Sequence, residues 1–131
     1  MKDILVVDDD NMMLEVIRRI LACEGIHATC VSSGEEALET LRERNFSLMI
    51  TDFNMPGRHG LGLDGLDLSR KGHELAPDMP IIMDTSGLSS ENVTLAREIG
   101  IAKILVKPFL PSEMLESIHF VMDKRTYHQC I

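Results

Sequence analysis

The fold is decided near the N-terminus, by the stretch Ile4-Leu5-Val6-Val7-Asp8-Asp9-Asp10. Its four apolar residues are mostly β-branched, which is typical of a short strand buried on both faces of a parallel sheet. The three aspartates end that strand abruptly, and Asp10 is the expected N-cap of a following helix. Apolar residues then recur at helical steps from Met13 to Leu21, and Gly25 is a typical C-terminal stop.

The same alternation of strand and helix continues along the chain. Further strands are predicted at 27–31, 48–51, 80–83 (ending near Thr85) and 104–106. Helices are predicted from the capping box at 33–36, over 64–76, over 90–99, and along the apolar stripe at 114–122. Five short strands alternating with five helices predict an α/β fold, with a parallel sheet covered on both faces and right-handed crossovers.

Composition narrows the class of protein. The chain has 131 residues, of which 44% are hydrophobic and 26% charged, as in one ordinary globular domain. A net charge of −8 argues against nucleic acid or an anionic membrane as a direct partner. The three cysteines form no Cys-x-x-Cys pair, which disfavours a disulfide framework or a zinc site. No apolar run approaches a membrane span and no signal-peptide pattern is present, so we expect a cytoplasmic protein.

Polar side chains follow four of the predicted strands, at the point where each strand ends. In open α/β sheets, binding sites form at these carboxyl ends. The residues are Asp8 and Asp9 after the first strand, Asp52 after the third, Thr85 and Ser86 after the fourth, and Lys107 after the fifth. We therefore expect three carboxylates, a hydroxyl and an ammonium group to face one crevice.

This set of groups suits phosphoryl chemistry. Carboxylates packed closely repel one another unless they are neutralised, and Mg²⁺ binds to such oxygen ligands. A carboxylate can act as the nucleophile and form an aspartyl phosphate. Lys107 can pair with a carboxylate before transfer and with a phosphate oxygen after it, and Thr85 can donate its hydroxyl to another phosphate oxygen.

Four motifs in order resemble the response-regulator receiver family of two-component signal transduction. They are Ile4-Leu5-Val6-Val7-Asp8-Asp9, Asp52-Phe53-Asn54-Met55-Pro56-Gly57, Thr85-Ser86 and Lys107-Pro108-Phe109. The resemblance covers essentially the whole chain. It implies a flavodoxin-like fold with strand order 2-1-3-4-5, a receiver domain over 1–123, and a short tail over 124–131 with no output domain.

The resemblance also implies roles by position. Asp52 would be the phosphoacceptor. Asp9 would bind Mg²⁺ directly, Asp8 would help through water, and Asn54 would offer its backbone carbonyl. Asp52 itself would be the fourth ligand of the metal. The protein would be a phosphoacceptor switch and not an enzyme in the ordinary sense, with self-catalysed phosphotransfer and dephosphorylation.

Further implied roles concern the phosphoryl group and the partners. Thr85 would be the switch hydroxyl, Lys107 would contact the phosphoryl group, and Pro108 would follow a cis peptide. Ser86 is a candidate phosphate contact, with a purely local role as the alternative. The implied partners are a sensor histidine kinase or a histidine phosphotransfer protein, and a downstream effector at an output face of the fourth helix, fifth strand and fifth helix. A homodimer formed on phosphorylation is compatible with this pattern.

The sequence departs from the family pattern in four places. The loop over 57–65 is long, and a usual Met-Asp-Gly is displaced to Leu63-Asp64-Gly65. Asp84 stands where an apolar residue is expected, so it has to find a partner or lie near the surface. Ile104 replaces a frequent aromatic residue, and Gly87 has no side chain to shield a phosphate.

Three other interpretations remain open at this point. One is a receiver-like scaffold that binds partners without phosphorylation. Another is a phosphatase similar to the haloacid-dehalogenase family, with Asp8 as nucleophile and Asp10 as general acid and base. The third is a dinucleotide fingerprint at Gly60-x-Gly62-x-x-Gly65, which is disfavoured because these glycines do not follow directly on a strand.

Overall fold

The structure, a computed structural model, describes residues 3–55 and 62–130, with side chains in these ranges up to Asp123. Strands and helices alternate throughout. The elements are β1 (Ile4–Val7), α1 (Asn11–Cys23), β2 (Ala28–Val31), α2 (Gly34–Glu43), β3 (Leu48–Asp52), α3 (Gly65–Leu75), β4 (Ile81–Thr85), α4 (Ser90–Ile99), β5 (Lys103–Val106) and α5 (Pro111–Cys130). The helix α5 includes residues 124–130 of the segment expected to be a tail.

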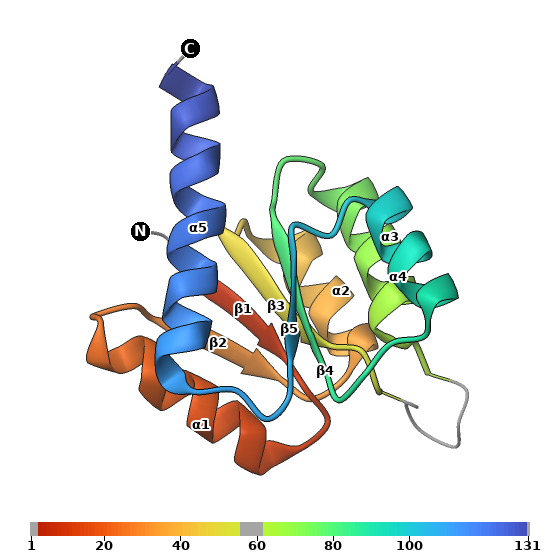
Figure 1. Cartoon of the computed structure of the whole chain (residues 1–131), viewed down its shortest axis with the longest axis horizontal. Coiled ribbons are helices and arrows are strands. Elements are labelled where there is room, and N and C mark those ends of the chain that lie inside the picture. The colour runs from red at the N-terminus through yellow and green to blue at the C-terminus, as the bar shows by residue number, and fades with distance from the viewer. Residues whose placement is uncertain (1–2, 56–61, 131) are drawn as a thin grey trace.

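The five strands form one parallel sheet in the order β2-β1-β3-β4-β5, as the resemblance implied (Figure 1). The strand order reverses between β1 and β3, because the chain first builds outward from β1 to β2 and then returns to the other side of β1. The fold is therefore the flavodoxin-like α/β fold. A crevice at the carboxyl ends of β1 and β3 is where such sheets place their sites.

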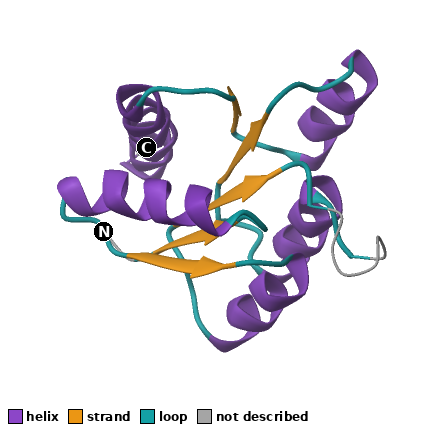
Figure 2. Ribbon diagram, turned by 90° about the horizontal axis from the view of Figure 1, so that it is seen from below, coloured by secondary structure: helices purple, strands orange, loops and turns teal. Residues whose placement is uncertain are grey.

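Helices cover both faces of the sheet. The helices α1 and α5 pack on one face, and α2, α3 and α4 lie on the other (Figure 2). Alternation along each strand divides the core accordingly: Ile4 and Val6 of β1 face α1 and α5, whereas Leu5 and Val7 face α2 and α3. The strands are almost wholly apolar because both of their faces are buried.

Local signals in the sequence begin and end the helices as expected. Asp10 caps α1, its carboxylate accepting a hydrogen bond from Met12 N, and Gly25 follows that helix with a φ of 71°. Ser33 caps α2 through Glu36 N, while the Glu36 carboxylate accepts from the Ser32 hydroxyl. Among the helices described, none combines the length and apolar character needed to cross a membrane.

Candidate functional site

Three aspartates form a row across the carboxyl edge of the sheet. Asp52 is the register partner of Asp84 in the neighbouring strand, and Asp8 directly follows Val7, the partner of Thr51. Their places in the alternation put all three on the side of the sheet that α1 and α5 cover. Each side chain is buried, and each offers an oxygen within 4.8 Å of the oxygens of the other two.

Lys107 supplies the positive charge of this pocket. Its Nζ lies 3.2 Å from Asp52 Oδ1, to which it donates a hydrogen bond, and 3.6 Å from Asp8 Oδ2. The lysine side chain is 22% exposed, so the ammonium group reaches the pocket from its rim. The sequence-based prediction that Lys107 pairs with a strand-end carboxylate thus has its counterpart in the geometry.

Burial dominates the electrostatics of the carboxylates. Loss of hydration raises the pKa of Asp8 to about 6 and the pKa of Asp84 to about 7, since Lys107 offsets only part of the cost. Burial alone lowers the pKa of Lys107, but the charges of Asp84, Asp8 and Asp52 raise it overall. The pocket therefore holds more negative charge than its own lysine neutralises.

Asp84 is the site residue whose place in the pocket the sequence did not reveal. We expected it to find a partner or to lie near the surface. It is only 1% exposed, and neither of its oxygens has a hydrogen-bond partner from another residue in the described part of the chain. The signal that could have found it was its position directly before Thr85, in the register row of Asp52.

The remaining strand-end groups lie around the carboxylates. The Thr85 hydroxyl is engaged with the backbone of Gly87, accepting from Gly87 N and lying 3.1 Å from Gly87 O. The backbone N–H of Asn54 donates to Asp52 Oδ1 at 3.3 Å, and the Asn54 side chain reaches the Ser86 hydroxyl at 3.5 Å. The peptide between Lys107 and Pro108 is cis, as the resemblance implied.

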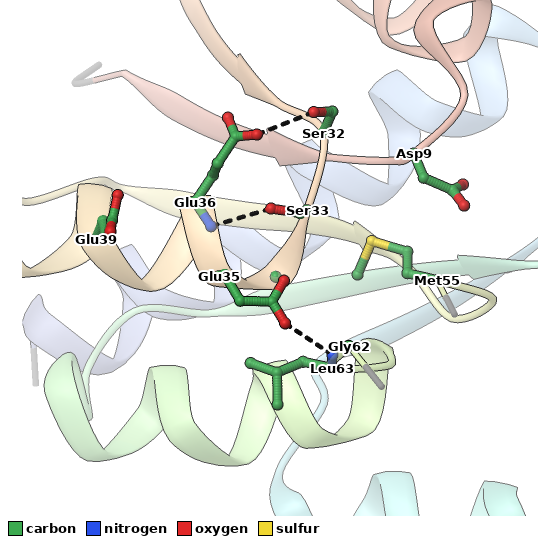
Figure 3. Close-up of a pocket in the computed structure, with 10 residues that line it drawn as sticks. Asp9, Ser32, Ser33, Glu35, Glu36, Glu39, Met55, Gly62 and Leu63 are labelled. Atoms are coloured by element: carbon green, nitrogen blue, oxygen red, sulfur yellow. Dashed lines mark hydrogen bonds between the residues drawn. The ribbon is translucent and has the colours of Figure 1, made fainter. Parts of the chain in front are cut away.

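Asp9 lies apart from the row of buried carboxylates. It is exposed and lines a neighbouring pocket of about 570 Å³ between the start of α2 and the segment before α3 (Figure 3). The wall of this pocket includes Glu35, whose carboxylate accepts a hydrogen bond from Leu63 N. Of the four residues expected to bind a cation, the structure thus brings Asp8 and Asp52 together, places Asn54 beside them, and leaves Asp9 at the exposed rim.

The start of α3 packs directly on the phosphoacceptor candidate. A Cβ added to Gly65 would lie 2.5 Å from the backbone oxygen of Asp52, so only glycine allows this close approach. Asp64 caps the helix by accepting from Asp67 N at 2.8 Å. These are the roles of the displaced Leu63-Asp64-Gly65 motif, whereas residues 57–61 of the expected loop lie outside the described residues.

The pocket fits a divalent cation. Asp8 Oδ2 and both oxygens of Asp84 are buried without a hydrogen-bond partner, and carboxylate oxygens are the donors that Mg²⁺ prefers.

The phosphatase interpretation is weakened, because it needs Asp10 as acid and base, and the Asp10 side chain is exposed and occupied as a helix cap.

Comparison with known proteins agrees with this geometry. The family model of the response regulator receiver domain matches residues 4–119. The response regulator receiver protein CpdR of Brucella abortus is 34% identical over 118 residues, covering 90% of this chain and 94% of the relative. The chemotaxis protein CheY of Pseudomonas aeruginosa is 31% identical over 124 residues, covering 92% of this chain and 96% of the relative.

Among solved structures, a CheY-like receiver domain protein from Methanospirillum hungatei superimposes with a TM-score of 0.90 at 30% identity, over 98% of each chain. The similarity therefore extends over nearly the full length of both chains. The family match spans most of the chain, and the sheet carries an acidic pocket at its carboxyl edge. Both features are those of a signalling module of two-component systems. The chain belongs to the response regulator receiver domain family.

Proposed function

We propose that this domain accepts a phosphoryl group on Asp52 from the phosphohistidine of a sensor histidine kinase or a histidine phosphotransfer protein. The observation that carries the proposal is the contact of Lys107 Nζ with Asp52 Oδ1 at 3.2 Å inside a pocket of buried aspartates. An ammonium group held there pairs with the carboxylate before transfer and with a phosphate oxygen after it. The pocket thus offers a nucleophile and a charge partner in contact with each other.

The transfer exchanges one bond to phosphorus for another. A carboxylate oxygen of Asp52 attacks phosphorus, the bond from phosphorus to the donor imidazole nitrogen breaks, and the imidazole leaves neutral after taking up a proton. The product is an acyl phosphate on Asp52. The domain contributes by positioning the nucleophile and by neutralising charge that develops on the phosphoryl oxygens.

Mg²⁺ is the proposed cofactor. Asp8, Asp52 and the backbone carbonyl of Asn54 would hold it, and Asp9 would join them from the exposed rim. Bound there, the cation supplies charge neutralisation for the carboxylates and for the phosphoryl oxygens. Its support in the structure is the set of buried carboxylate oxygens that no described hydrogen-bond donor satisfies.

Phosphorylation would act as a switch through Thr85 and Lys107. For its hydroxyl to contact the phosphoryl group, Thr85 would exchange its bonds with Gly87 for a bond to phosphate, with Ser86 as a further candidate contact. That exchange would shift the equilibrium between two conformations of the face formed by α4, β5 and α5. Val106 and Phe120, on β5 and α5, are exposed apolar side chains suited to a downstream effector or a second copy of the domain.

The test is covalent labelling. The parent, Asp52→Asn and Asp8→Asn are each incubated with Mg²⁺ and acetyl phosphate, quenched, and measured by intact-mass spectrometry. The parent should gain one phosphoryl group in an acid-stable, base-labile linkage, and Asp52→Asn should gain none. Labelling of Asp52→Asn with loss in Asp8→Asn would instead support the phosphatase chemistry. Absence of labelling in a folded parent, with no effect of beryllofluoride and Mg²⁺ on stability, would support a phosphorylation-independent scaffold.

A further inference from the structure

Asp84 is a buried carboxylate in a strand whose other residues, apart from Thr85, are apolar. Its neighbours along β4 are Ile82, Met83 and Thr85, all buried. The alternation of the strand directs Asp84 to the same side as Ile82, which belongs to the core beneath α1 and α5. Asp84 therefore forms the floor of the pocket on the side of β4, beside Asp52.

The Asp84 side chain, which is 1% exposed, is buried without a hydrogen bond from another described residue, and the charge of Lys107 offsets only part of the cost of its burial. The ammonium of Lys107 makes its close contacts with Asp52 and Asp8, at 3.2 and 3.6 Å. A buried carboxylate without a hydrogen-bond donor is costly, so its presence in this position points to a ligand that the protein itself does not supply.

The charge of the pocket indicates what that ligand is. When ionised, the three buried carboxylates Asp8, Asp52 and Asp84 carry three negative charges against the single positive charge of Lys107, before the solvent-exposed Asp9 at the rim is counted. The surplus of two negative charges matches a divalent cation, and an oxygen of each carboxylate lies within 4.8 Å of the others. Hard divalent cations with oxygen ligands fit such a set, whereas a monovalent cation would leave the surplus half neutralised.

We propose that Asp84 contributes a third buried carboxylate to the divalent-cation site and sets the affinity of that site. The inference concerns the pocket of the proposed function, but binding of the cation needs no phosphoryl donor. Its outcome is therefore separable from the labelling of Asp52.

The proposal predicts opposite effects with and without a cation. In chelator, Asp84→Asn removes a buried charge that Lys107 compensates only in part, and it relieves the repulsion with Asp8 and Asp52, so the protein should melt at a higher temperature. With a divalent cation, the variant lacks one of the ligands and should gain less stability than the parent. Substitution that merely damages the fold would lower the melting temperature in both conditions.

The experiment is a thermal-melting titration of the unphosphorylated full chain with Mg²⁺ or Mn²⁺, at about pH 8, where the carboxylates are ionised. We expect Asp84→Asn to raise Tm in EDTA by about 5 °C. We also expect it to raise the dissociation constant for the cation about tenfold, which means weaker binding. The control is Asp78→Asn, an exposed aspartate outside the pocket, which changes the net charge equally and should leave both quantities unchanged.

A second variant, Asp84→Leu, keeps the proposal falsifiable if the buried amide of asparagine itself destabilises the fold, because leucine suits the apolar strand. An Asp84→Leu protein more stable in EDTA, with weakened cation binding, supports the proposal. Parental cation affinity in both variants overturns it, whether or not Asp52 is labelled by acetyl phosphate.

Discussion

Each end of the sheet carries a buried or half-buried aspartate in charged surroundings. The two aspartates differ in whether other residues form hydrogen bonds with the carboxylate. At the amino end, Asp3 accepts hydrogen bonds from His27 Nδ1 at 2.6 Å and Thr29 Oγ1 at 3.1 Å, and pairs with Arg44 at 3.0 Å. At the carboxyl end, Asp84 has no hydrogen bond from another described residue. A carboxylate with hydrogen-bond partners stabilises the fold, whereas the oxygens of a carboxylate without such partners are available to bind a ligand.

The pKa values of these carboxylates express the same contrast. Burial alone raises the pKa of Asp3, but the bonds from His27 and Thr29 and the charge of Arg44 lower it overall. Burial raises the pKa of Asp84 to about 7, because no hydrogen bond from another described residue opposes it and the charge of Lys107 lowers it only in part. Ionisation of Asp84 at the carboxyl end therefore lowers the stability of the fold, whereas ionisation of Asp3 at the amino end does not.

The largest expected effect comes from removing Lys107, which among the described residues is the one basic side chain in the carboxyl-end pocket. Lys107→Ala leaves the carboxylates of Asp8, Asp52 and Asp84 without compensation and should destabilise the protein in EDTA by about 3 kcal/mol near neutral pH. Chemical denaturation measures this change. Added Mg²⁺ should restore most of the loss, because cation binding is retained while the contact with the phosphoryl group is lost. An unchanged free energy of unfolding in EDTA would show that Lys107 does not neutralise the pocket.

The second effect concerns the close packing of α3 on the pocket. Gly65→Ala places a Cβ against the backbone oxygen of Asp52 and should cost about 2 kcal/mol of stability. Denaturant unfolding and the rate of labelling by acetyl phosphate measure the two consequences, since the substitution also displaces Asp52. Gly25→Ala is a useful comparison: its added Cβ meets nothing within 4 Å, so it tests the left-handed backbone alone, without contact with the pocket.

The third effect is a dependence on pH that should distinguish Asp84→Asn from the parent in EDTA. The folded-state pKa of Asp84 lies above its unfolded value of 3.8, so the folded protein favours the protonated carboxyl group. Its penalty is absent below the unfolded pKa, grows as the pH rises from about 4 to about 7, and is complete above the folded pKa. The advantage of Asp84→Asn in melting temperature should therefore shrink towards zero near pH 4 and be complete near pH 8. An advantage that is constant with pH would exclude the carboxylate charge as its origin.

The smallest effect should be found at the amino end. Asp3→Asn weakens the bonds to His27 and Arg44 and should lower stability by about 1 kcal/mol, because these partners are largely exposed. Thermal melting at low and high salt measures the loss, which salt should reduce. The sign is opposite to that expected for Asp84→Asn in EDTA. A gain in stability for Asp3→Asn would remove the contrast between the two ends.

The sequence was sufficient for the fold because each element carries its own signal. The apolar runs of β1 and β3, the cap at Asp10 and the glycine after α1 are local features, and alternation of strand and helix restricts the topology. The motif resemblance, built on strand-end residues such as Asp8, Asp52 and Lys107, supplied the strand order that the structure confirms.

What could not be predicted depends on register and on close approach. Periodicity places Asp84 in a strand, but only the pairing of β3 with β4 shows that it lies beside Asp52. Gly65 stands in the displaced Leu63-Asp64-Gly65 motif and in the glycine fingerprint, but neither pattern reveals that an added Cβ would lie only 2.5 Å from the backbone oxygen of Asp52. The resemblance implies a cation-binding role for Asp9 but not its exposure, and the structure places this side chain on the exposed rim of the pocket.

The most direct test of the carboxyl-end pocket is binding of beryllofluoride, which mimics a phosphoryl group on a carboxylate, followed by backbone amide NMR in the presence of Mg²⁺. The account predicts that the largest shifts surround Asp52, Thr85 and Lys107 and extend into α4 and β5, with the amides near Asp3 and His27 unchanged. Asp52→Asn should show none of the beryllofluoride-dependent shifts. Shifts centred on the amino end, or the same shifts in Asp52→Asn, would contradict it.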